Sequence, residues 1–153
     1  MEKDVKIRTS DGKYIYGTFN VKGKREDSLV IFVHGLICDQ NDHLYLNGSR
    51  FLNKQGFATF RFNLYGHQKN TRKLQQCTVE QHGKDVTTVI NYFRKRFHKV
   101  FLIGHSMGGP SILFSDASKV AGLIFWDPSI DLQKINKTVY KYNQKLDSYR
   151  CLR

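Results

Sequence analysis

The sequence predicts an α/β fold in which a mostly parallel sheet carries helices on both faces. Four short apolar runs alternate with longer segments of helical character, an order typical of right-handed crossovers between parallel strands. The run 29–33 is apolar at every position, as expected for a strand covered on both faces. A later run, 99–103, leads into a glycine-flanked serine at 104–109, a pattern that turns a buried strand sharply into a helix.

Short-range signals place the elements that precede this turn. Alternating polarity around Asp11-Gly12 is typical of an antiparallel hairpin. Gly56 is a typical helix end, and Thr78 with Gln81 three residues later forms a capping box. The predicted elements are a hairpin over 4–21, a charged loop over 22–27, strands over 29–33 and 57–62, a helix over 42–55, a loop over 61–71 and a long helix from 78.

The long helix has one apolar face. Its apolar residues recur at the spacing of a single buried stripe, and they are Val86, Val89, Ile90, Phe93 and Phe97. After the serine turn we expect a short helix through Asp116 and a further buried strand over 121–126. Residues 129–153 are polar and basic and predict at most a weak helix, so we expect one domain with a core over 1–128 and a tail over 129–153.

Composition narrows the class of protein. The chain has 153 residues, of which 40% are hydrophobic, enough for one core. Its net charge of +12 is scattered, which argues against a nucleic-acid partner. Three cysteines at no metal-like spacing favour reduced thiols, no metal and a cytoplasmic location. The sequence contains no apolar run of about 18 residues, the length that would predict a membrane span.

Ser106 has the surroundings of an activated nucleophile. Glycines at 104 and 108 leave room for the sharp turn that holds the serine hydroxyl above the edge of the sheet. The backbone N–H of Met107, at the start of the next helix, is aimed at the place where an oxyanion would form. The pattern is therefore that of a nucleophile elbow.

Three motifs, each after a predicted strand, resemble the α/β-hydrolase family. They are Val33-His34-Gly35, Arg61 to His67, and Gly104 to Gly109, and they are most similar to the branch of monoacylglycerol-lipase-like and serine-aminopeptidase-like proteins. The resemblance covers about residues 4–128 and implies an α/β-hydrolase fold that lacks the family's C-terminal part.

The resemblance also implies roles for single residues. Ser106 would be the nucleophile, and the N–H groups of Leu36 and Met107 would form the oxyanion hole. The motif residues that would shape the site are His34, Gly35, Gly104, His105 and Gly108. The substrate would be a small acyl compound, with no cofactor and no metal. The second motif departs from the family pattern, because Asn63 stands for Asp and Tyr65 for Arg.

The family's acid and base follow the serine in the chain, in the order Asp or Glu and then His. All six histidines of this sequence precede Ser106. Asp127 is a candidate acid, with a turn cap as its alternative role, and His67 is a candidate substitute base on a loop that is scaffold in the family. A serine hydroxyl without an imidazole is a weak nucleophile at neutral pH.

The leading hypothesis is a serine hydrolase for an ester or related acyl bond, inactive or impaired in this chain. The alternatives are a non-catalytic binding or interaction protein of the same fold and, more weakly, a protein that binds an anionic partner. The apolar strand that ends at Trp126 would be an uncovered sheet edge. We therefore expect either an N-terminal portion of a longer hydrolase or an edge covered by a second copy or a partner chain.

Overall fold

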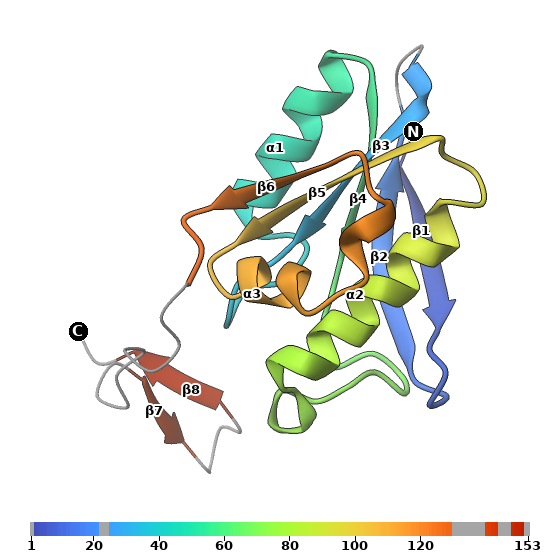
Figure 1. Cartoon of the computed structure of the whole chain (residues 1–153). Helices are drawn as coiled ribbons and strands as arrows, with labels where there is room; N and C mark the ends of the chain where they lie inside the picture. Colours follow the sequence, from blue (N-terminus) through green and yellow to red (C-terminus); the bar gives the residue numbers. More distant parts are fainter. Residues whose placement is uncertain (1, 22–24, 130–139, 144–147, 152–153) are drawn as a thin grey trace.

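The computed structural model of the chain describes residues 2–21, 25–129, 140–143 and 148–151. Its main sheet has six strands in the order β1-β2-β4-β3-β5-β6 (Figure 1). Strand β3 pairs in parallel with β4 and β5, and β5 pairs in parallel with β6, whereas β1–β2 and β2–β4 are antiparallel. The predicted fold class, a mostly parallel sheet with an N-terminal antiparallel pair, is confirmed.

The strands lie close to their predicted positions. Their bounds are β1 Glu2–Arg8, β2 Tyr14–Asn20, β3 Arg25–Val33, β4 Phe57–Phe62, β5 Lys99–His105 and β6 Gly122–Trp126. The predicted charged loop over 22–27 is wrong from Arg25 onward, because backbone pairing with β4 extends past the apolar run. A register shift between Arg25 and Leu29 accommodates the extra residues.

Helices cover both faces of the sheet, as predicted (Figure 1). Helix α1 (His43–Lys54) packs on one face through Tyr45, which contacts the side of β3 that carries Val30 and Phe32. Helices α2 (Val79–Phe93) and α3 (Gly108–Leu113) cover the other face.

Helix α2 begins as the capping signal predicts, but only half of the capping box forms. The Thr78 hydroxyl accepts from the Gln81 N–H at 3.2 Å. The Gln81 side chain donates instead to Asp85, four residues further along the helix, at 3.2 Å. The Gln81 amide that would have completed the box thus donates to the buried carboxylate of Asp85.

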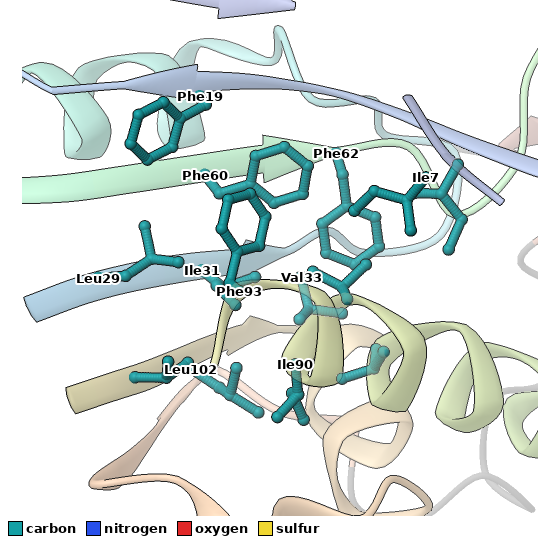
Figure 2. Packing of buried hydrophobic residues seen from close by; sticks show 14 of the residues in the cluster. Ile7, Phe19, Leu29, Ile31, Val33, Phe60, Phe62, Ile90, Phe93 and Leu102 are labelled. Carbon is teal, nitrogen blue, oxygen red and sulfur yellow. The ribbon is translucent and has the colours of Figure 1, made fainter. Parts of the chain in front are cut away.

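The larger core lies between the sheet and α2 (Figure 2). Phe93 of the predicted stripe reaches Phe60 with ring centroids 4.5 Å apart and Phe19 at 5.8 Å. All five residues of the stripe are buried, including Phe97 beyond the end of the helix. This core fixes β3 and β5, whose C-terminal ends carry the first and third sequence motifs.

Two expectations for the segment after the elbow are wrong. Helix α3 ends at Leu113 rather than near Asp116, because the Ser115 hydroxyl and amide both bond to the carbonyl of Ile112. A 3-10 turn follows at Ala117–Lys119. Strand β6 forms but is not buried, because it is the last strand of the sheet; Ile124 is 52% exposed.

The weak helix expected over 129–153 is also wrong where the structure describes the backbone. Strands β7 (Tyr140–Asn143) and β8 (Ser148–Cys151) form a separate antiparallel pair. Aromatic and polar residues alternate in Tyr140-Lys141-Tyr142, which is a strand pattern rather than a helical one. The rest of this expected helix, apart from Ser129, lies outside the described residues.

Candidate active site

Ser106 occupies a strained turn between β5 and α3. Its φ of 51° lies in the left-handed region, which a non-glycine residue adopts at an energetic cost. A Cβ at Gly108 would lie 2.1 Å from the Val33 carbonyl oxygen, and one at Gly104 would lie 2.7 Å from the Gly108 carbonyl oxygen. Both glycines therefore permit the close packing of the elbow that carries Ser106.

The loop after β3 lies directly against this elbow. A Cβ at Gly35 would lie 3.1 Å from Ser106 Cβ. We call residues 34–38 the oxyanion loop, after the role predicted for Leu36. Among the described residues, neither the Leu36 N–H nor the Met107 N–H donates to an acceptor. Both amides are available to a ligand, and their role as an oxyanion hole stays a prediction.

His34 holds the loop and is not free to act as a base. Its Nε2 accepts from the Leu64 N–H at 3.0 Å, so the proton is on Nδ1, which donates to the Gly35 carbonyl at 2.7 Å. The ring is buried, and desolvation lowers its pKa from 6.5 to about 4. His34 thus holds the oxyanion loop against Leu64, and its predicted role at the site stays a prediction.

His105 contacts helix α1. Its Nδ1 lies 2.9 Å from the hydroxyl of Tyr45. The same hydroxyl accepts from the Gly35 N–H at 3.0 Å. Tyr45 therefore joins the oxyanion loop to the residue before Ser106, a connection that the sequence did not reveal.

Tyr65 contacts the other end of the oxyanion loop. Its hydroxyl accepts from the Ile37 N–H at 2.7 Å, and its ring meets the His34 ring edge-on with centroids 5.3 Å apart. The one signal for this role in the sequence is the replacement of the family's Arg by Tyr at this position of the second motif.

The Ser106 hydroxyl has a serine rather than a histidine as its neighbour. Its Oγ lies 3.2 Å from the Oγ of Ser129, and the Ser129 N–H donates to the Ser106 carbonyl at 3.1 Å. In the described part of the chain, no imidazole forms a hydrogen bond with Ser106 Oγ. His67, the candidate substitute base, is exposed on the loop after β4 and makes no such contact.

Asp127 lies beside the elbow. It follows Trp126, whose carbonyl accepts from the Ser106 N–H at 3.1 Å, and it has a φ of 46°. Its side chain is exposed and forms no hydrogen bond or ion pair with any residue that the structure describes. The position is near the nucleophile, but its role as catalytic acid stays a prediction.

A pocket of about 540 Å³ borders the oxyanion loop. Its lining includes Ile37, Cys38 and Tyr65, together with the polar residues His67 and Lys73. Burial raises the pKa of the Cys38 thiol, which favours its protonated form.

Two further searches bear on the chemistry. Within the described ranges, no three His, Cys, Asp or Glu side chains gather as metal ligands. The helices that the structure describes include none long and apolar enough to cross a bilayer.

Comparison with known proteins identifies the family. Residues 24–149 match the family described as serine aminopeptidase, S33. No curated protein sequence matches the chain. An esterase of Pyrococcus furiosus, Pf2001, has a similar structure, with a TM-score of 0.78 and 25% identity over 95% of this chain and 58% of its own.

Two further esterases share the fold. Est1E of Butyrivibrio proteoclasticus has a TM-score of 0.72 and 22% identity over 89% of this chain and 55% of its own. The esterase EaEST of Exiguobacterium antarcticum has a TM-score of 0.69 and 22% identity over 84% of this chain and 46% of its own. This chain thus spans about half the length of these esterases, and it belongs to the serine aminopeptidase S33 family of α/β-hydrolases.

Proposed function

We propose that this chain is an esterase-type serine hydrolase module with a nucleophile and an oxyanion hole, which by itself turns over acyl substrates slowly or not at all. Ser106 would attack the carbonyl of a small ester, and the N–H groups of Leu36 and Met107 would stabilise the oxyanion. The 25% identity to the Pyrococcus furiosus esterase supports an ester as the substrate class.

One observation carries the proposal. The strained Ser106 lies against the oxyanion loop, two nearby amides are available, and the hydroxyl contacts Ser129 in place of an imidazole. The groups proposed to stabilise negative charge are therefore close to Ser106, whereas no imidazole of the described residues forms a hydrogen bond with its hydroxyl. Each oxyanion donor lowers the barrier by on the order of 3 kcal/mol, but this does not replace a general base.

Covalent labelling with an activated aryl phosphonate tests the proposal. The reagent needs a nucleophilic serine and an oxyanion hole, and it reports one turnover as a mass increase. We expect slow modification of Ser106 that accelerates with added imidazole, which can supply the missing base from solution. Ser106→Ala should abolish it, and Ser129→Ala should retain it. Equal modification of wild type and Ser106→Ala would contradict the proposal.

The second candidate is a non-catalytic interaction protein of the same fold. It is favoured by an apolar surface at the edge of the sheet, where Leu123, Ile124, Phe125 and Trp126 of β6 are each at least 39% exposed. A module of this kind would bind a partner but would show no serine-specific labelling, even with imidazole present. The labelling experiment therefore separates the two candidates.

A further inference from the structure

Three successive backbone amides of the oxyanion loop differ in their hydrogen bonding. The Gly35 N–H donates to the Tyr45 hydroxyl at 3.0 Å, and the Ile37 N–H donates to the Tyr65 hydroxyl at 2.7 Å. The Leu36 N–H between them has no acceptor among the described residues. Two tyrosine hydroxyls thus hold the amides on either side of the one that would bind an oxyanion.

Tyr45 is anchored on both sides of the site. Its side chain is only 1% exposed and packs its ring near Phe32, with centroids 6.4 Å apart. Its hydroxyl accepts from Gly35 and also lies 2.9 Å from His105 Nδ1. Gly35 precedes Leu36 and His105 comes two residues before Met107, so one hydroxyl links the segments that supply both proposed oxyanion donors.

Tyr65 holds Ile37 in a backbone conformation that the oxyanion loop would not favour by itself. Ile37 has a φ of 62°, a left-handed conformation that is a genuine outlier for a β-branched residue. Such strain costs on the order of 1–3 kcal/mol and persists only where surrounding contacts impose it. The hydrogen bond from Ile37 to Tyr65 is such a contact, and the Tyr65 ring is fixed between His34 and His82 at centroid distances of 5.3 and 6.0 Å.

The phenol group suits this task because it stays uncharged. Burial raises the pKa of Tyr65 to about 12 and raises that of Tyr45 well above its usual range. A neutral hydroxyl accepts a hydrogen bond without placing a negative charge near a developing oxyanion, as a carboxylate acceptor would.

We propose that Tyr45 and Tyr65 are positioning residues that clamp the oxyanion loop and leave the Leu36 N–H, which lies between the two clamped amides, without an acceptor among the described residues. This inference rests on the proposed function, because the clamp has a catalytic purpose only if Ser106 reacts. Tyr65 stands where the family pattern has Arg. This departure in the second motif would supply one of the two tyrosines of the clamp.

Amide hydrogen exchange followed by NMR tests the clamp without any reaction. In the wild type we expect protected Gly35 and Ile37 amides and a fast-exchanging Leu36 amide. Tyr65→Phe should speed exchange at Ile37 by about 5- to 10-fold, the equivalent of one net hydrogen bond, and Tyr45→Phe should do the same at Gly35. Tyr16→Phe is the matched control, because it removes a tyrosine hydrogen bond to the Lys69 carbonyl outside the loop.

Phosphonate labelling of Ser106 with imidazole present supplies the second readout. We expect Tyr65→Phe to lower the rate constant about tenfold, whereas Tyr16→Phe should change it by less than about twofold. Unchanged Ile37 exchange in Tyr65→Phe would overturn the clamp. Faster exchange with an unchanged labelling rate would overturn the positioning role. A wild type that never labels would overturn the proposed function, whereas the exchange pattern would still decide the clamp.

Discussion

The hydroxyl oxygens of Ser106 and Ser129 lie 3.2 Å apart, within hydrogen-bond distance. Neither hydroxyl can remove the other's proton at neutral pH. The elbow and the oxyanion loop are nevertheless packed as closely as their glycines allow. The packing of the elbow and the proposed reactivity of Ser106 can therefore be tested separately.

Gly108→Ala should disrupt the elbow. The new Cβ would lie 2.1 Å from the Val33 carbonyl oxygen, a backbone atom that cannot move without shifting β3. We expect a loss of about 3 kcal/mol in the free energy of unfolding, measured by urea denaturation. Gly122→Ala is the control, because its Cβ would meet only the Phe101 ring at 3.2 Å. Equal losses for both variants would contradict the packing argument.

Arg72→Ala should be strongly destabilising. The guanidinium donates to Asp85 at 2.9 Å and to Asp11 at 2.7 Å, and both Arg72 and Asp85 are buried. Removing the cation leaves an unpaired buried carboxylate, which costs about 3–5 kcal/mol. Lys119→Ala breaks an exposed pair with Asp116 and should cost less than about 1 kcal/mol. Urea denaturation of both variants checks the contrast, which a small effect at Arg72 would refute.

Stability should fall as the pH drops from 6.5 toward 4. Burial lowers the pKa of His34 and of His82 from 6.5 to about 4, so the unfolded chain binds more protons in this window. The stability that each neutral ring provides is complete above about pH 6.5. By pH 5, each histidine should have lowered the free energy of unfolding by about 2 kcal/mol. Urea denaturation at pH 7 and pH 5 measures the difference.

His82→Phe separates the two histidines. The Nε2 of His82 is buried without a hydrogen-bond partner among the described residues, so its removal costs little. The variant should lose about half of the pH dependence, whereas His98→Gln, a change at an exposed histidine, should keep the wild-type profile. An unchanged profile in His82→Phe would show that His82 does not titrate in this window.

The β6 edge should drive self-association. Strand β6 has a free edge within the described sheet, and two copies can pair such edges around a two-fold axis. We expect light scattering to detect dimers whose fraction rises with protein concentration. Ile124→Lys should give monomers, and Phe51→Lys, an equal change on the exposed side of α1, should not. A wild type that stays monomeric at all concentrations would exclude a second copy as the cover.

Much of this structure could be predicted because its signals are local. The glycines at 104 and 108 mark the elbow through the backbone contacts that a side chain would prevent. The stripe of α2 is visible because its buried residues are all apolar. The sequence does not reveal the buried face of α1, because the buried residues of this helix are Tyr45, Ser49 and Asn53 and do not form an apolar stripe.

The remainder depends on partners that are distant in the sequence. Ser49 is buried because its hydroxyl lies 2.6 Å from that of Thr59, ten positions later. The sequence predicts that Arg61 begins a polar loop. In the structure, Arg61 is 1% exposed and pairs with Glu2, which lies 59 positions earlier. Tyr45, Tyr65 and Ser129 acquire their places at the site in the same way. No short pattern encodes these contacts, since each requires the folded sheet.

Steady-state hydrolysis of a short aryl ester tests the central claim most directly. The account predicts that this chain shows little or no turnover above a Ser106→Ala background, and that added imidazole increases turnover in the wild type alone. The reason is that Ser106 lies on the elbow beside the oxyanion loop, but no imidazole of the described residues forms a hydrogen bond with its hydroxyl. An acylation burst followed by steady turnover without imidazole, both abolished by Ser106→Ala, would show that a base is present and would contradict the account.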